Sequence, residues 1–479
     1  MVFVVPDPSR LTVMPADDPH GVWATIREAV RGTRIDYTTA PVGRAVILLA
    51  VPMVVEMSME SIFAVADVFW VARLGADAVA TVGLTESMMT IIYTAAMGLS
   101  IGATALVARR TGEHNLEEAA HAAGQSILLG LGVAAAIALV AAPGAPALLR
   151  TMGASDEVVR SGSGFTRLML GGNATVLLLF LLNAVFRGAG DAAIAMRVLV
   201  LGNLLNIILG PCFIFGLGPF PRLGVAGAAV ATNLGRGTAV CYQISALARG
   251  RGRVKIARRH LRLDLGAMQS VLRLSGLGTV QILIGTASYI GLVRILSAFG
   301  SAALAGYTIG IRLIVFALLP AFGISNAAAT MVGQNLGAGR PDRAERAVWA
   351  AAAYNMVFLG AVGLVFFLGA PSITALFSTD PLVQPYAIGS LRTVSLGFVF
   401  YAYGMVLTSA FNGAGDTWTP TYINLFVFWV FEIPLAWFLA TRAGFGARGV
   451  FIALTVSYSM LAVVSALLFR RGAWKSRKV

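Results

Sequence analysis

The 479-residue sequence is poor in charged residues, histidine and cysteine. Charged side chains make up only 12% of the chain, which is about half the fraction of an ordinary soluble protein. The four histidines are scattered and predict no metal site, and neither a Ser/His/Asp pattern nor a GxxxxGK[ST] phosphate loop occurs. Cys212 and Cys241 both lie inside apolar segments, so a disulfide framework is not expected. These shortages argue against a soluble protein, a metalloenzyme and an ATPase.

What the chain has instead is long apolar segments. Hydrophobic residues make up 57% of it, and the mean hydropathy is +0.80. A membrane-spanning helix needs about 20 apolar residues, and twelve segments satisfy that length: 46–70, 80–107, 120–142, 164–185, 194–216, 224–247, 268–291, 303–331, 347–369, 386–409, 419–440 and 446–469. The 53 glycines suit close packing between such helices. The sequence therefore predicts an all-α integral membrane protein with twelve transmembrane helices.

The net charge of +14 follows the predicted topology. Basic residues gather on alternate connections, at 108–110, 249–262, 339–346 and the C-terminal tail. The positive-inside rule then places both termini in the cytoplasm, as in a multi-pass protein of the inner (plasma) membrane. We expect these basic runs to contact the lipid bilayer and not nucleic acid. The first 40 residues lack the apolar core of a signal peptide, so cleavage is not expected, although a short surface helix around 20–35 is.

The chain also contains an internal repeat. "VFRGAGD" at 185–191 returns as "AFNGAGD" at 410–416, and two further pairs of segments align at the same offset. Because six helices separate the copies, both should insert in the same orientation and be related by a parallel pseudo-two-fold axis, as in transporters. The sequence therefore divides into an arm (1–43), an N-lobe (44–247), a basic linker (248–267), a C-lobe (268–470) and a tail (471–479). This architecture predicts a transporter with a central cleft and alternating access more strongly than it predicts an enzyme.

The first apolar segment carries three acidic residues, Glu56, Glu60 and Asp67. An acid at the centre of a bilayer costs roughly 2.5–3.5 kcal/mol. On a helix, Glu60 and Asp67 lie within about 40° of Glu56, so all three share one stripe. That stripe faces either polar groups of neighbouring helices or a wet cavity that binds ions or cationic solutes. Glu60 lies mid-span without Lys or Arg within one helical turn, which suits a carboxyl that binds and releases a proton.

Glu56 and other polar and aromatic residues in the spans are candidates for contacts with a substrate. Glu86 lies near the start of the second span, and Glu432 precedes Pro434 in a later span, where proline frees a backbone carbonyl. Aromatic faces attract cations, so Tyr289, Tyr401 and Trp429 are also candidates. For each of these residues, ordinary packing or helix-end hydration remains the alternative interpretation.

Several long motifs resemble those of multidrug and toxic compound extrusion (MATE) transporters. They are "DVFWVARLGADAVATVGL" (67–84), "GLSIGATALVARRTGE" (98–113), "FRGAGD" (186–191), "GQNLGAGRPDRAERA" (333–347) and "FNGAGD" (411–416). They occur in the family's order across residues 44–470. The resemblance implies a V-shaped, lobe-swapped bundle that exports organic cations in exchange for H⁺ or Na⁺.

The resemblance also implies roles for particular residues. Asp67 matches the family's helix-1 aspartate of cation coupling, and Asn203 and Asn206 match the asparagine pattern that faces it. This chain departs from the pattern at Gly210, where many relatives have an acid, and Glu60 is expected to compensate. Carboxylate and amide oxygens suit a hard cation, so Asp67, Asn203 and Asn206 form a possible Na⁺ site.

Two transport functions remain open from sequence. The first is an antiporter that works as a monomer without a cofactor other than its coupling ion, and that exports small cationic amphipathic substrates. The alternative is a lipid or oligosaccharide-lipid flippase of a related two-lobed fold, whose cleft would be lined with Arg and Lys. The acids of the first span favour the antiporter. Carboxylates and amides serve both H⁺ and Na⁺, so the sequence leaves the coupling ion open.

Overall fold

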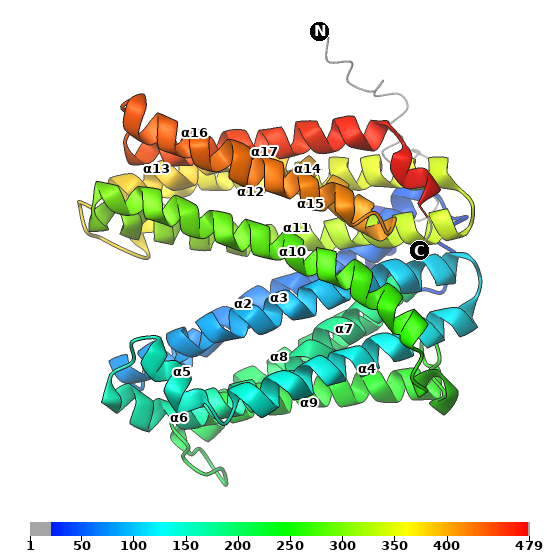
Figure 1. Cartoon of the computed structure of the whole chain (residues 1–479), viewed down its shortest axis with the longest axis horizontal. Coiled ribbons are helices and arrows are strands. Elements are labelled where there is room, and N and C mark those ends of the chain that lie inside the picture. The colour runs from blue at the N-terminus through cyan, green and yellow to red at the C-terminus, as the bar shows by residue number, and fades with distance from the viewer. Residues whose placement is uncertain (1–20, 478–479) are drawn as a thin grey trace. The chain divides into compact units, whose positions relative to one another are not determined.

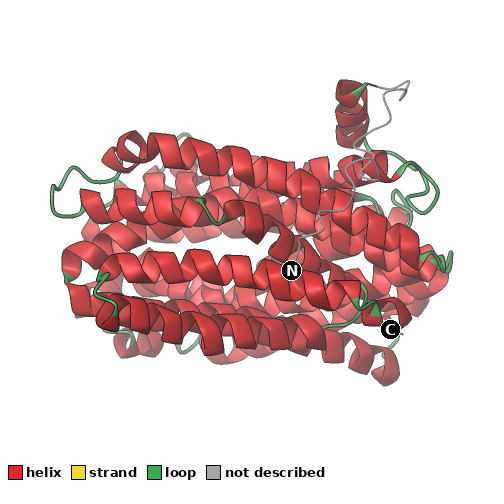
Figure 2. Cartoon of the chain, turned by 90° about the horizontal axis from the view of Figure 1, so that it is seen from above, coloured by secondary structure: helices red, strands yellow, loops and turns green. Residues whose placement is uncertain are grey.

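The computed structural model describes residues 21–477, and that range forms helices and loops without a β-strand (Figure 2). Ten helices within it are long and apolar enough to cross a membrane. They are Val42–Ala72 (α2), Ala76–Gly112 (α3), Leu116–Ala141 (α4), Asp156–Ala189 (α6 and α7, which meet at Gly172), Ala192–Phe215 (α8), Leu265–Phe299 (α10, Leu265–Leu296, with a 3₁₀ turn), Ser301–Gly337 (α11), Pro341–Ala375 (α12), Trp418–Arg442 and Ala447–Arg470 (α17). The range Trp418–Arg442 consists of α15 (Trp418–Asn424) and α16 (Ile433–Trp437), each followed by a π-helical stretch. A pair bent by 57°, Gln384–Ser395 (α13) and Phe398–Gly413 (α14), makes eleven if it counts as one span.

The remaining predicted span, 224–247, corresponds to α9 (Val225–Arg249). Its 25 residues are long enough to cross a membrane, but it is not among the helices that are also sufficiently apolar. The polar side chains of Arg236 and Gln243 lower the mean hydropathy of α9. Both are buried inside the protein, so they do not face lipid. All twelve predicted segments are thus helical, and the all-α fold class is confirmed.

The chain divides into two compact units, each of which is considered separately (Figure 1). Unit 1 comprises the described residues up to Val54 together with those from Val280 onward, and unit 2 is Val55–Thr279. Both boundaries fall inside helices, α2 and α10. The units therefore differ from the predicted lobes at the first part of each of these helices, and the predicted linker belongs to unit 2. Sequence could not show this because a continuous helix carries no signal where its packing partner changes.

Close glycine contacts explain why these helix halves pack where they do. In unit 2, a Cβ at Gly98 of α3 would lie 2.0 Å from the Thr279 Oγ1 of α10. In unit 1, a Cβ at Gly323 of α11 would lie 2.6 Å from the Met53 backbone of α2. Gly98 and Gly323 occupy equivalent positions of the repeat, so each repeat uses a glycine to let the first half of a long helix approach its neighbour.

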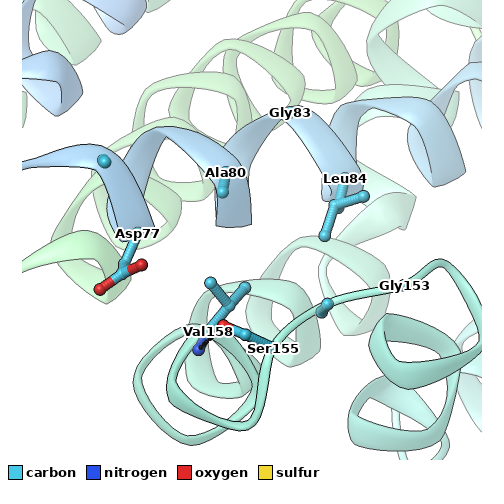
Figure 3. A pocket seen from close by; sticks show the side chains of 9 residues that line it. Asp77, Ala80, Gly83, Leu84, Gly153, Ser155 and Val158 are labelled. Atoms are coloured by element: carbon cyan, nitrogen blue, oxygen red, sulfur yellow. Dashed lines mark hydrogen bonds between the residues drawn. The ribbon is translucent and has the colours of Figure 1, made fainter.

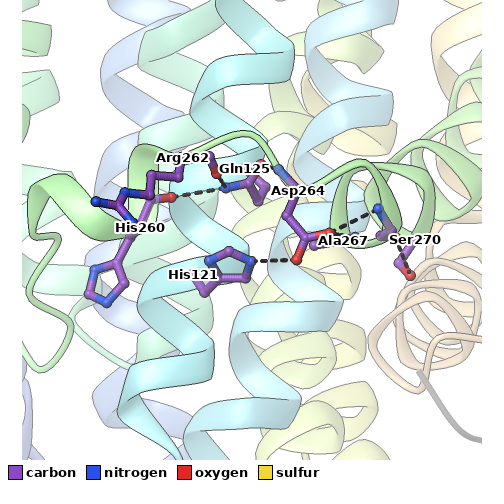
Figure 4. A network of polar contacts seen from close by, with 8 residues as sticks. His121, Gln125, His260, Arg262, Asp264, Ala267 and Ser270 are labelled. Atoms are coloured by element: carbon purple, nitrogen blue, oxygen red, sulfur yellow. Dashed lines mark hydrogen bonds and ion pairs between the residues drawn. The ribbon is translucent and has the colours of Figure 1, made fainter.

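The predicted linker is docked against α4 of unit 2 (Figure 4). The Gln125 amide donates to the carbonyls of His260 and Arg262, and the Asp264 backbone amide donates to Gln125 Oε1. His121 Nε2 lies 3.0 Å from Asp264 Oδ2. Hydrogen bonds from the Ala267 backbone amide and then from His121 lower the pKa of Asp264. The linker is therefore a fixed part of unit 2.

The predicted surface helix is confirmed as α1 (Val22–Arg31). Residues 1–20 of the predicted arm lie outside the described residues. Within the described tail, Trp474 is fully buried and stacks on Phe469, with 4.5 Å between the ring centroids. Lys475 pairs with Glu345 of α12 at 2.6 Å, so the tail also packs on unit 1.

Candidate functional site

The three acids of α2 have different surroundings. Glu56, in unit 2, is 1% exposed, and its Oε1 accepts hydrogen bonds from Asn183 Nδ2 and an Arg187 guanidinium nitrogen, both at 2.9 Å. Arg187 is itself buried on α7 (Asn173–Ala189). Glu56 was predicted to contact substrate. The structure instead places its carboxylate in a buried ion pair, so we assign it to packing.

Glu60 lies beside a buried arginine of α9. An Arg236 guanidinium nitrogen is 3.9 Å from Glu60 Oε2, and the Arg236 side chain is 4% exposed whereas that of Glu60 is 19% exposed. Arg236 also donates to the Tyr93 hydroxyl at 3.3 Å and lies 5.0 Å from the centre of the Phe63 ring. A cation held by one carboxylate and two aromatic groups is well compensated. Arg236 is therefore a resident positive charge next to the predicted coupling acid.

Asp67 belongs to the same electrostatic cluster. It is partly exposed and interacts electrostatically with Glu86 and Arg236. An acid near a helix end, such as Asp67, can also pair with a nearby basic residue, here Arg73. The Arg73 guanidinium instead lies over the rings of Phe69 and Trp70, at 4.6 and 5.1 Å from their centres. Glu60, Asp67 and Glu86 thus all interact electrostatically with Arg236, and Glu60 is the one within ion-pair distance of it among the described residues.

The two predicted asparagines lie on α8 (Ala192–Phe215) beside this cluster. A Cβ at Gly235 of α9 would lie 2.5 Å from the Gly202 carbonyl oxygen, so glycine lets the two helices meet closely there. Asn206 Nδ2 donates to Thr232 Oγ1 at 2.9 Å. Asn203 is 1% exposed and approaches Glu60, yet its Nδ2 has no hydrogen-bond partner of ordinary geometry in the described structure. The Asn203 amide is therefore close enough to respond to a change in the charge of Glu60.

The predicted Na⁺ site stays a prediction. Within residues 21–477, no group of three or more His, Cys, Asp and Glu side chains is placed to hold a metal ion. Asn203 approaches Glu60, so the nearby oxygens that suit a hard cation include Glu60. Gly210 leaves room, since a Cβ there would lie in ordinary contact, 3.7 Å from Trp70 Cδ1. With Gly210 in place of an acid, Glu60 is the carboxylate that approaches Asn203 of α8.

Unit 1 holds a second, separate polar cluster around Glu432. Glu432 is 1% exposed and accepts a hydrogen bond from Ser288 Oγ at 2.8 Å. No basic side chain of residues 21–477 lies within ion-pair distance of it. Glu432 ends a π-helical stretch, Leu425–Glu432, just before Pro434, which agrees with the expected local bend.

The predicted aromatic residues are only partly brought together in unit 1. Tyr401 stacks on Tyr458 with 3.9 Å between ring centroids, and Tyr401 interacts electrostatically with Glu432. Tyr289 stacks on the buried Tyr307 at 6.0 Å. Trp429 is 44% exposed, and its Nε1 donates to the Ile284 carbonyl. Their contact with a substrate stays a prediction.

An open pocket of about 540 Å³ lies elsewhere on unit 2 (Figure 3). It is formed by the first turns of α3 and the segment around the start of α6 (Asp156–Gly171). Its lining is Ala76, Asp77, Ala80, Gly83, Leu84, Gly153, Ala154, Ser155 and Val158. None of the predicted site residues belongs to it, and a single carboxylate gives it no chemistry of its own.

Sequence reasoning missed Arg187 and Arg236. Arg187 lies inside the repeated motif "FRGAGD", but its counterpart in the second repeat is Asn412, so the motif did not single it out. Arg236 lies within a predicted span, and only the low apolarity of 224–247 could have drawn attention to it. A charged residue inside a span usually has a partner, so the three acids of the first span were themselves a signal to look for basic partners.

Comparisons with known proteins agree with this geometry. The MatE family model matches residues 52–212 and, a second time, 278–438, which confirms the internal repeat. A probable multidrug resistance protein NorM of Thermotoga maritima is 25% identical over 437 residues, covering 91% of this chain and 94% of that protein. A FAD transporter of Shewanella oneidensis is also 25% identical, with 90% and 95% covered. The outward-facing structure of a multidrug resistance MATE family transporter of the MOP superfamily matches with a TM-score of 0.85 at 28% identity, covering 92% of this chain and 98% of that one.

Proposed function

Because the chain belongs to the MATE family of multi-pass membrane transporters, we propose that it is a secondary antiporter that exports small cationic amphipathic compounds in exchange for H⁺ or Na⁺. The observation that carries this proposal is the cluster of Glu60, Asp67 and Glu86 around Arg236 in unit 2. Because Glu56 is paired to Arg187, three carboxylates interact electrostatically with the single positive charge of Arg236. Such a cluster favours binding of a cation over binding of an anion.

The cluster also offers a way to couple two cations. A proton or Na⁺ on Glu60 or Asp67 removes a negative charge from the cluster and lowers its attraction for an organic cation. Release of the coupling ion restores that attraction, so the two cations bind in competition. In this proposal Asn203, with its unpaired Nδ2 close to Glu60, hydrogen-bonds to the carboxylate in its ionised form.

Topology and partners follow from the same proposal. The protein lies in the inner (plasma) membrane with both termini in the cytoplasm, and it works as a monomer by alternating access without a further cofactor. The basic connections contact the bilayer, and no nucleic acid takes part. The relatives named NorM support export of drugs, whereas the FAD transporter shows that the family's likeness extends to a protein with another cargo.

The proposal is tested with purified protein in liposomes. A fluorescent organic cation is followed while a pH gradient and then a Na⁺ gradient is imposed across the membrane. We expect one of the two gradients to drive transport against the cation's own gradient, and protein-free liposomes to show none. Transport of an anionic or lipid-linked cargo with no cation movement under either gradient would replace the proposal by the flippase alternative.

A further inference from the structure

Helix α1 exposes apolar side chains and turns small or polar ones inward. Trp23 is 83% exposed, and Val22 is 52% exposed. Thr25 and Ala29, which lie about 120–160° round the helix from Trp23, are fully buried or nearly so. A helix of a soluble protein has the reverse arrangement, with its apolar stripe against the core. The exposed side of α1 is therefore suited to an apolar environment outside the protein.

The exposed side is also basic. Arg27 is exposed, and at 100° per residue it lies about 40° round the helix from Trp23. The acidic residue of the helix, Glu28, pairs with Arg44 of α2 at 2.7 Å. Its charge is thereby compensated within the protein, so α1 presents a tryptophan and a positive charge together. A negatively charged surface with an apolar interior complements that combination.

Contacts within unit 1 hold α1 in a defined place. Gly32 ends the helix at a positive φ of 80°. The following turn packs on the start of α12, where Arg340 donates to the Thr38 carbonyl at 2.7 Å and Arg343 donates to the Tyr37 carbonyl at 3.2 Å. Tyr37 and Thr38 are buried. Figure 2 shows α1 as the short helix that follows the grey segment, and it runs across the direction of the long helices of its unit. A helix that crosses the spans lies along the plane of a bilayer.

We propose that α1 is an interfacial helix that binds the anionic phospholipid headgroups of the leaflet at which unit 1 begins. Trp23 enters the boundary between headgroups and acyl chains, while Arg27 contacts headgroup phosphates. The bond from Glu28 to Arg44, at the start of the first span, connects this contact to α2. The inference is independent of which compound the protein transports.

Hydrogen exchange of the full-length protein in lipid nanodiscs tests the proposal. Discs of phosphatidylcholine alone are compared with discs that also contain phosphatidylglycerol, and the amides of residues 22–31 are followed. We expect exchange to slow severalfold in the anionic discs. Trp23→Ala and Arg27→Gln should each reduce that difference, by about fivefold for the arginine. Arg222→Gln, an exposed arginine of the loop between α8 and α9, is the matched control and should behave as the wild type.

Two results would overturn the proposal. One is equal exchange of residues 22–31 in neutral and anionic discs, which would mean that α1 does not bind anionic headgroups. The other is equal protection when inorganic phosphate is added to phosphatidylcholine discs, because Arg27 would then bind a free ion and not a membrane. Exchange in the rest of unit 1 reports whether each variant is folded, so a misfolded variant is recognised.

Discussion

Glu56 and Glu60 are one helical turn apart on α2, yet their neighbours give them different tasks. The Glu56 carboxylate is enclosed with Arg187 and Asn183, whereas the Glu60 carboxylate is partly exposed and 3.9 Å from an Arg236 nitrogen. A buried ion pair is compatible with a stable fold only while both partners are present, because either charge alone would be buried without compensation. The first acid therefore stabilises unit 2, and the second is free to exchange ions.

This difference predicts the effect of breaking the buried pair. Glu56→Gln or Arg187→Gln alone should lower the free energy of unfolding by about 3–5 kcal/mol, because each leaves an uncompensated buried charge. The double variant should recover a large part of that loss. Thermal unfolding in detergent measures all three. A double variant no more stable than either single variant would contradict the pairing.

Arg236 gives a second prediction at the scale of residues. Arg236→Gln removes the resident cation and leaves Glu60, Asp67 and Glu86 without their positive neighbour. We expect an organic cation to bind about tenfold more tightly, or roughly 1.4 kcal/mol, and to leave more slowly. Arg236→Lys keeps the charge and serves as the matched control, with an affinity close to that of the wild type. Weaker cation binding by the Gln variant, with the fold intact, would show that Arg236 contacts the substrate in another way.

At the scale of elements, small residues decide which helices meet. Replacing Gly98 or Gly323 by leucine should destabilise the protein by about 1–3 kcal/mol, since the new side chain would overlap Thr279 or the Met53 backbone. Gly132 of α4 has open space at its Cβ position, so Gly132→Leu is the control and should be nearly neutral. Melting temperatures of the three variants check this. Equal effects at all three positions would mean that the close contacts carry no special weight.

The docked linker predicts a pH dependence at the start of α10. Folding lowers the pKa of Asp264, mainly through the Ala267 amide and then through His121. The carboxylate therefore stabilises docking above the ordinary aspartate pKa of about 4, and this contribution is lost as the pH falls through the lowered value. Other charged groups beside the segment are Glu117, Arg259 and His260.

Hydrogen exchange of residues 257–267 measures this effect. Wild-type exchange, corrected for its intrinsic pH dependence, should stay slow from pH 7 to about pH 5 and rise below about pH 4. Asp264→Asn should exchange faster at neutral pH and show little further change on acidification. Asp380→Asn, in an exposed loop of unit 1, is the control. If Asp264→Asn showed the same pH dependence of exchange as the wild type, the Asp264 carboxylate would not stabilise docking of the linker.

Sequence predicted elements well where one pattern dominates. The twelve apolar segments are helices because spanning length and apolar composition act over more than 20 residues at once. The exact extents were harder, since α3 reaches from Ala76 to Gly112 where 80–107 was predicted. The π-helical turns before Pro434 and the partner of each helix half depend on contacts between distant segments. Local patterns do not contain that information.

At the scale of the whole molecule, the repeat and the family were readable from recurring motifs, and the MatE matches to both parts of the chain confirm them. The acids of α2 were found because a charge in an apolar segment is conspicuous. Their partners were not found, because Arg187 and Arg236 come from helices more than 120 residues away in sequence. The pairing that separates Glu56 from Glu60 exists only in the folded unit.

The central claim is that Glu60 and Asp67 of α2 bind the coupling ion and the organic cation in turn. Calorimetric titration of the purified protein with an organic cation, in buffers of different ionisation enthalpy and with or without Na⁺, tests it most directly. The account predicts that binding releases about one proton, or competes with Na⁺, and that Glu60→Gln or Asp67→Asn abolishes this linkage while Asp77→Asn, in the same unit, preserves it. Cation binding that releases no proton and is indifferent to Na⁺ would contradict the account.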